Sequence, residues 1–161
     1  KAGADGIVCA ALHENGTVNR EALKQLVDAS TPLPFTFHRA FDHTPDPLRA
    51  LDDIVACGCT RILTSGQKKS ALDGRSLIRE LIQRAGNEPI ILPGAGITAY
   101  NVRELIEETG CREVHLSARK IVQRHAHLNP EIQLGSAHDT NTWQCTDEAM
   151  LQEVLRITNE Y

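Results

Sequence analysis

The sequence predicts an α/β protein of the TIM-barrel type, that is, a (β/α)8 barrel of which about five strand–helix units are present. Short apolar runs alternate with amphipathic segments along the whole chain, which is typical of parallel strands joined by helical crossovers. A glycine, two linker residues and a strand-like run recur at Gly3, Gly58 and Gly110. The 161 residues, 41% of them apolar, suffice for one core, so we expect residues 1–161 to form one partial barrel domain.

Five strands are expected, each an apolar or β-branched run that turn residues bound. They are Gly6–Leu12, Pro34–Arg39, Arg61–Ser65, Pro89–Pro93 and Glu113–Ser117. The chain opens with Lys1 and Gly3, a cation and a glycine in the order typical of a helix end. We therefore expect further residues upstream in the full protein.

Amphipathic helices are expected between the strands and after the last one. They span residues 20–29, 47–57, 75–86, 100–109 and 147–159. Asn19, Asp46 and Thr98 are expected to cap three of these helices, and Pro47 suits a first helical turn. Residues 119–146 are expected to form a long polar loop, where His125, His127 and His138 are either solvated residues or ligands of a metal.

The repeat also predicts which side chains face the barrel interior. Because strand residues alternate between two faces, Arg61 and Glu113 would meet as a buried pair inside the barrel, with Gly6 in the same layer to leave them room. An interior ion pair favours a closed barrel over a flavodoxin-like open sheet, whose faces are covered by helices and apolar. Five units alone expose two sheet edges, so either upstream strands or a second copy of the chain would cover them.

Charge and cysteine usage limit the classes of partner. The net charge of −4 gives no reason to expect nucleic acid or an anionic membrane as a partner. No apolar run is long enough to cross a bilayer. Five cysteines, an odd number without a C-x-x-C pair, indicate a reducing compartment, so a cytoplasmic location is expected.

Polar side chains follow the carboxyl ends of the predicted strands, where ligands bind in barrels and in open α/β sheets. The candidate catalytic residues are His38, Arg39, Asp42, His115 and Ser117. His38 is either a proton carrier, a metal ligand or a structural histidine. Arg39 and Asp42 either orient an anionic substrate or lock their loop with a salt bridge.

Two glycine-bearing loops follow neighbouring strands and are candidates for anion binding. Ser65 and Gly66 form the first loop, and Gly94 and Gly96 belong to the second. Glycine lets backbone N–H groups approach a ligand closely, and barrel phosphate sites commonly use the last loops of the barrel. A small anionic ligand is therefore expected across these two loops.

Four segments together resemble the CutC copper homeostasis family, and the resemblance extends from residue 1 to about residue 136. They are TFHRAFD (36–42), RILTSGQ (61–67), PGAGI (93–97) and EVHLSA (113–118). The resemblance implies a TIM barrel whose first three strand–helix units are lacking here, so that the five strands of this chain are the fourth to the eighth. Ala95 departs from the family pattern, which has glycine in the middle of P-G-G-G.

This resemblance is the reason to expect copper as a ligand. Cu(I) prefers thiolate and thioether ligands, and Cys9 is the cysteine nearest the strand ends. The alternation nevertheless places Cys9 opposite Val8 and Ala10, on a face expected to contact a helix. The first hypothesis is a cytosolic copper homeostasis protein that binds Cu(I) through ligands partly in the missing upstream region, with Cys9 as the candidate ligand in this chain. The alternative is a TIM-barrel enzyme that acts on a small anionic or phosphorylated metabolite.

Overall fold

A four-stranded parallel sheet with helices forms the first of two units in the computed structural model, which describes residues 3–123 and 142–161. The first unit is Lys1–Leu116 and the second is Ser117–Tyr161. In the first unit the strands are β1 (Ile7–Cys9), β2 (Phe35–Phe37), β3 (Arg61–Thr64) and β4 (Ile90–Pro93). Its helices are α1 (Arg20–Ser30), the short 3-10 helix η1 (Arg39–His43), α2 (Pro47–Ala56), α3 (Arg75–Ala85) and α4 (Val102–Thr109).

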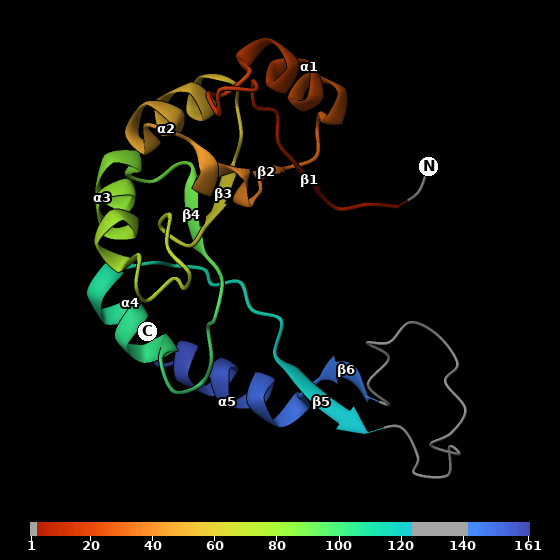
Figure 1. The fold of residues 1–161 in the computed structure, drawn as a ribbon, viewed down its shortest axis with the longest axis vertical. Coiled ribbons are helices and arrows are strands. Elements are labelled where there is room, and N and C mark those ends of the chain that lie inside the picture. Colours follow the sequence, from red (N-terminus) through yellow and green to blue (C-terminus); the bar gives the residue numbers. More distant parts are fainter. Residues whose placement is uncertain (1–2, 124–141) are drawn as a thin grey trace, which may run out of the picture. The chain divides into compact units, whose positions relative to one another are not determined.

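The strand order identifies the sheet as a segment of a barrel. The strands lie in the order β1-β2-β3-β4, and all neighbouring pairs are parallel. A flavodoxin-like sheet instead reverses its strand order and carries helices on both faces. Here α1 to α4 all lie on one side of the sheet (Figure 1). The chain is therefore a partial (β/α)8 barrel, and the open-sheet alternative is wrong.

The core lies between the sheet and these helices. Phe35, Phe37 and Ile62 point from the strands to the helices and are fully buried. They pack in a layer with fully buried apolar residues of the helices, among them Leu23, Leu51, Ile54, Ile78, Leu81 and Leu105. The alternate residues of the strands, such as Thr36 and Leu63, lie on the opposite face and are partly exposed, as the two-residue period of a strand requires.

The predicted interior pair forms, but it is not buried. The guanidinium of Arg61 donates to both carboxylate oxygens of Glu113, with Nε–Oε2 and Nη2–Oε1 distances of 2.9 Å. The two side chains are 32% and 35% exposed, so the expectation of burial was wrong. The pair lies on the sheet face opposite the helices, which is only partly covered in the described residues.

The place of Gly6 depends on the stagger between neighbouring strands. The lateral register places Val8, Thr36, Arg61 and Ile90 in one row across the sheet. Gly94 pairs with His115, so Glu113 lies two residues beyond the row of Arg61 and still pairs with it, because the layers of a barrel are staggered relative to such rows. Gly6 lies two residues before Val8, which is consistent with the same stagger, and its place in the layer of Arg61 stays a prediction.

The fifth expected strand, Glu113–Ser117, is reduced to one bridge. His115 pairs with Gly94, and the N–H of His115 donates to the carbonyl of Pro93 at 2.8 Å. In a parallel pair the N–H of residue 93 would supply the preceding ladder bond, but proline has none. The ladder therefore cannot extend toward Glu113.

The second unit contains an antiparallel strand pair and a helix. β5 (Arg119–Gln123) pairs with β6 (Thr142–Thr146), and α5 (Glu148–Thr158) follows. Both ends of the expected loop 119–146 are thus strands, which suits β-formers such as Val122 and Trp143, paired across the ribbon. Residues 124–141, with His125, His127 and His138, lie outside the described residues.

The helices begin and end within two residues of their expected positions. Asn19 and Asp46 cap α1 and α2, each accepting a backbone N–H at 3.0 Å. Thr98 is not a cap, because its own N–H donates to Asn101 Oδ1 and α4 begins only at Val102. Among the described residues, no helix has both the length and the apolarity needed to span a membrane.

Candidate functional site

The candidate site lies at the carboxyl ends of β2, β3 and β4, which we call the mouth. The 3-10 helix η1 directly follows β2 and carries Arg39 and Asp42. Ser65 follows β3, and Gly94 follows β4. The N–H of Gly94 donates to the carbonyl of Thr64 at 2.9 Å, and the N–H of Ala71 donates to the carbonyl of Ala95 at 3.0 Å. The loops after β3 and β4 therefore lie side by side, as the sequence predicted.

Asp42 is the centre of the hydrogen-bond network at the mouth. Its Oδ1 accepts from Thr64 Oγ1 at 2.5 Å, Ser65 N at 3.1 Å and Gln67 N at 3.2 Å. Its Oδ2 accepts from Arg39 Nε at 2.7 Å. Burial alone would raise the pKa of Asp42, but the hydrogen bonds from Thr64, Arg39, Ser65 and Gln67 outweigh it and hold the pKa below its ordinary value. Asp42 is thus a fixed negative charge.

Arg39 is held in place and still open to solvent. Its Nη2 donates to Ser65 Oγ at 2.8 Å, and its Nε donates to Asp42. The Asp42 side chain is 7% exposed, whereas 45% of the Arg39 side chain is exposed. A guanidinium has five N–H donors in a fixed plane, so the two contacts orient Arg39 and leave donors available to a ligand.

Ser65 is fully enclosed in this network. Its Oγ lies 3.0 Å from Asp42 Oδ2 and 2.6 Å from the carbonyl oxygen of Lys68. A hydroxyl has one proton, so it donates to one of these two acceptors while it accepts from Arg39. Ser65 is fully buried, which makes it a connector between η1 and the loop after β3.

The amides of the loop after β3 are already used within the chain. Ser65 N and Gln67 N donate to Asp42, and Gly66 N donates to Thr64 Oγ1 at 2.9 Å. This is the arrangement of an anion-binding loop, and the anion is the carboxylate of Asp42.

The loop after β4 is less occupied. The N–H of Gly96 has no hydrogen-bond partner within the described residues, and Ala95 and Gly96 both have positive φ, at 93° and 70°. His115 lies against this loop, because a Cβ on Gly94 would stand 3.5 Å from Cδ2 of the imidazole. The exposed imidazole of His115 therefore borders the second predicted anion loop.

His38 has one ring nitrogen already engaged. Its Nδ1 accepts from the N–H of Ala40 at 3.1 Å, at the start of η1. Nδ1 must therefore be unprotonated, so Nε2 is the nitrogen left to carry a proton or to contact a ligand. The side chain is half-buried.

Two predicted site residues make no hydrogen bond to this network within the described part of the chain. Ser117 is exposed and belongs to the second unit. Cys9 pairs laterally with Phe37, whose side chain points to the helices, and Cys9 Sγ lies 3.8 Å from the carbonyl oxygen of Ala10. The alternation expected from the sequence thus holds for Cys9.

The described residues contain no group of three or more His, Cys, Asp or Glu side chains placed to hold a metal ion. Burial raises the pKa of the thiols of Cys57 and Cys111, and raises that of Cys59 to about 12. These three thiols are therefore protonated at neutral pH, which disfavours them as thiolate ligands.

Sequence reasoning missed three members of the network: Thr44, Thr64 and Gln67. Gln67 Nε2 donates to the carbonyl of Thr44 at 2.7 Å while its backbone N–H reaches Asp42. Thr64 and Gln67 flank Ser65-Gly66 in the motif RILTSGQ, so the signal was present. Their role required the partner Asp42, which lies more than twenty residues away.

The fold and the mouth define a class of protein, an α/β chain built as part of a TIM barrel with a polar network at the carboxyl ends of its strands. The model of the CutC family matches residues 1–120. A family protein CutC from Xylella fastidiosa is 40% identical over 160 residues, which cover 98% of this chain and 58% of that protein. A mouse protein named copper homeostasis protein cutC homolog is 38% identical over 161 residues, covering 98% of this chain and 59% of the mouse protein.

A solved structure supports the same assignment. The crystal structure of the putative copper homeostasis protein CutC from Streptococcus agalactiae matches with a TM-score of 0.66 and 35% identity, over 70% of this chain and 56% of that one. The chain thus spans somewhat more than half the length of these relatives. The chain belongs to the CutC family.

Proposed function

We propose that this chain acts in copper homeostasis, the role that the names of its relatives state, and that its mouth binds a small anionic ligand. Arg39 is the observation that carries the ligand proposal. Its guanidinium is oriented by Asp42 and Ser65, and its side chain is 45% exposed. A preoriented, accessible guanidinium is suited to a carboxylate or phosphate group.

The proposed ligand lies between Arg39, the loop with Gly94 and Gly96, and His115. The contacts from Asp42 through Thr64 to Gly94 connect these groups. The amides of Ser65 and Gly66 support the ligand less than the sequence suggested, because they already donate to Asp42 and Thr64. Exposed Lys68 and Lys69 follow that loop and add positive charge.

An enzymatic role at this mouth would divide the work among the predicted residues. His38 Nε2 is the candidate proton carrier, since Nδ1 is engaged with Ala40. Asp42, with its lowered pKa and several donors, positions Arg39 and does not exchange protons near neutral pH. His115 and Ser117 remain candidates for contacts with the substrate, which would be a small anionic or phosphorylated metabolite.

The test of the anion proposal is a titration of the chain with inorganic phosphate, followed by NMR of the backbone amides. Arg39→Gln should weaken binding about tenfold by removing charge-assisted hydrogen bonds. Gly96→Val should abolish it by crowding a backbone with positive φ. Arg84→Gln is the matched control, because Arg84 is a comparably exposed arginine, at 48%, on α3. Phosphate affinity that survives both mouth substitutions unchanged would contradict the proposal.

Cu(I) binding is the second candidate function, supported by the copper homeostasis names of the relatives. Cys9 is the proposed ligand, because it is only partly buried, whereas Cys57 and Cys59 are buried. Cys9→Ser should then measurably lower the affinity of the chain for Cu(I), as determined by a competition titration against a chromogenic chelator. If Cu(I) binding is lost only in Cys57→Ser and Cys59→Ser, the site lies at the amino-terminal end of β3. A chain that takes up no Cu(I) would end the assignment of a copper ligand to these residues.

The five cysteines are all free thiols, which supports a reducing, cytoplasmic location. The sheet edges at β1 and β4 support the further proposal that additional strands or a second copy of the chain cover them in the full protein.

A further inference from the structure

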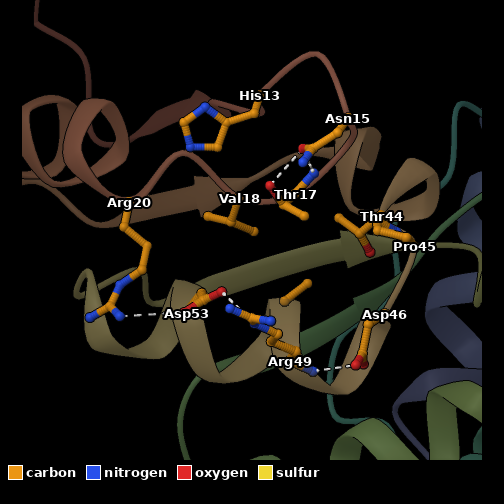
Figure 2. Close-up of a pocket in the computed structure, with 11 residues that line it drawn as sticks. His13, Asn15, Thr17, Val18, Arg20, Thr44, Pro45, Asp46, Arg49 and Asp53 are labelled. Atoms are coloured by element: carbon orange, nitrogen blue, oxygen red, sulfur yellow. Dashed lines mark hydrogen bonds and ion pairs between the residues drawn. The ribbon is translucent and has the colours of Figure 1, made fainter.

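A pocket lies outside the mouth, between the segment that joins β1 to α1 and the segment 44–53, which leads into α2 and includes most of it (Figure 2). Its volume is about 410 Å³, within the range of small-molecule sites. All of its lining residues belong to the first unit. None of them was a candidate site residue in the sequence, and of the network at the mouth only Thr44, the partner of Gln67, also lines this pocket.

The walls of this pocket are fixed by contacts in the chain. Leu12 pairs with Val18 in an antiparallel bridge, and Asn15 Oδ1 accepts from Thr17 N at 3.0 Å and from Thr17 Oγ1 at 2.7 Å. A Cβ on Gly16 would stand 3.0 Å from the carbonyl oxygen of His43, so this turn rests on the segment that leads into α2. Preformed walls lower the entropic cost of binding a ligand.

The pocket has an apolar floor. Val18 and Ala50 are 6% and 4% exposed, and Pro45 closes one side. Figure 2 shows Val18 in the middle of the pocket, with His13 on the opposite wall from α2. The body of a ligand here would therefore contact aliphatic carbon.

Two arginines stand at one end of the pocket around a single carboxylate. Arg20 Nη1 lies 3.6 Å from Asp53 Oδ1, and Arg49 Nε lies 4.0 Å from Asp53 Oδ2. Both are ion pairs without a hydrogen bond, and the two arginine side chains are 61% and 78% exposed. Asp46, at the other end, accepts the backbone N–H of Arg49 as the cap of α2. The arginine end thus carries one positive charge in excess and unused N–H donors.

We propose that this pocket binds a small monocarboxylate, with its carboxylate between Arg20 and Arg49 and its apolar body over Val18 and Ala50. Guanidinium groups match the planar geometry of a carboxylate. The single excess charge suits a monoanion, whereas the nearby Asp53 and Asp46 disfavour a phosphate dianion. The volume and the floor fit a compact aliphatic or aromatic body.

The test uses benzoate as the probe, with benzamide and benzylammonium as neutral and cationic molecules of the same shape. Titrations of the full 161-residue chain are followed by NMR of the backbone amides, so that the binding site is located as well as its affinity. Benzoate should shift amides near Val18, Thr44 and Ala50 in a saturable way, and the other two probes should not. Equal binding of benzamide or benzylammonium, or no saturable binding of benzoate, would overturn the proposal.

Substitutions at the exposed arginines separate this pocket from the mouth. Arg20→Gln and Arg49→Gln should each weaken benzoate about tenfold. Lys24→Gln removes a cation from the same helix α1 without touching the pocket, and should leave affinity unchanged. Asp53→Asn should tighten binding, because it removes the anion that shares the two guanidiniums. If Arg39→Gln abolishes the binding while Arg20→Gln does not, benzoate occupies the mouth and the pocket proposal fails.

Discussion

At the scale of single residues, Asp42 determines the geometry of the mouth. The sequence left two roles open for Arg39 and Asp42, substrate orientation and a salt bridge that locks the loop. The salt bridge forms at 2.7 Å, and Asp42 also accepts hydrogen bonds from three residues of β3 and its following loop. Asp42 locks the loop, and Arg39 is left as the residue that can contact a ligand. The sequence favoured the salt bridge, but it did not show how fully Asp42 is enclosed, because the other donors to Asp42 come from a distant segment.

We expect Asp42→Asn to destabilise the chain by about 3 kcal/mol at neutral pH, because it removes a buried charge from Arg39 and leaves donors such as Ser65 N poorly paired. The pKa of Asp42 lies below its ordinary 3.8 in the folded chain. Its stabilisation is therefore complete above the ordinary pKa and is lost as the pH falls through the folded pKa.

Urea unfolding of both chains at pH 7, 5 and 3 measures this effect. The difference in unfolding free energy should be the same at the first two pH values and smaller at the third. A difference that grows toward low pH would contradict the assigned direction of the pKa change.

At the scale of elements, a close backbone approach shapes the loop after β3. Gly66 has a φ of 67°, and a Cβ at this position would overlap the carbonyl group of Gly74, at the start of α3. The loop therefore folds back on the helix that follows it. This contact is invisible in the sequence, which shows only that both positions are glycine.

We expect Gly66→Ala to destabilise the chain by at least about 3 kcal/mol, since strain from positive φ adds to a backbone clash. Gly110→Ala is the matched control, because Gly110 has a φ of 71° in the left-handed helical region and no atom within 4 Å of an added Cβ. That control should cost only about 1–2 kcal/mol, the penalty of positive φ alone. Urea denaturation measures the free energy of unfolding of both variants. Equal decreases in the two variants would show that the clash with Gly74 is relieved at no cost.

The elements themselves were predictable to different degrees. Helix positions followed from apolar periodicity and from caps such as Asp46, so they agree within two residues. The prediction of the fifth strand was wrong because Pro93, on the neighbouring strand, lacks the N–H for one ladder hydrogen bond. The apolar periodicity of the fifth segment contains no information about that neighbour. The register of the strands, which places Val8 in the row of Arg61, is likewise a property of pairing and not of one segment.

At the scale of the whole molecule, Arg61 and Glu113 join segments that lie 52 residues apart in the first unit. Both side chains are about one-third exposed. Solvent therefore screens the pair, and its bidentate geometry contributes less than a buried pair would. The repeat correctly predicted that the two residues meet, but burial depends on what covers the sheet face, and no local pattern contains that information.

We expect Glu113→Gln to destabilise the chain by about 1 kcal/mol, far less than the loss for a fully buried pair. The pKa of Glu113 is lowered chiefly by its hydrogen bonds to Arg61, so this contribution should also shrink in acid. Asp52→Asn is the control, since Asp52 pairs with Arg84 at the surface and should show no measurable change. Unfolding at low and high salt tests both variants, and a loss several times larger than expected would indicate that the pair is covered in solution.

The bonds from Ser65 and Gln67 to Asp42 have a consequence for ligand selection. A dissolved anion at this loop must displace a carboxylate that is tethered to the same chain, whose effective concentration is at least on the order of millimolar. The displaced Asp42 would also lose Arg39 and Thr64 as partners. Anions that bind weakly are therefore excluded from this loop, and the ligand proposed for the mouth would bind beside it, where the N–H of Gly96 has no partner among the described residues.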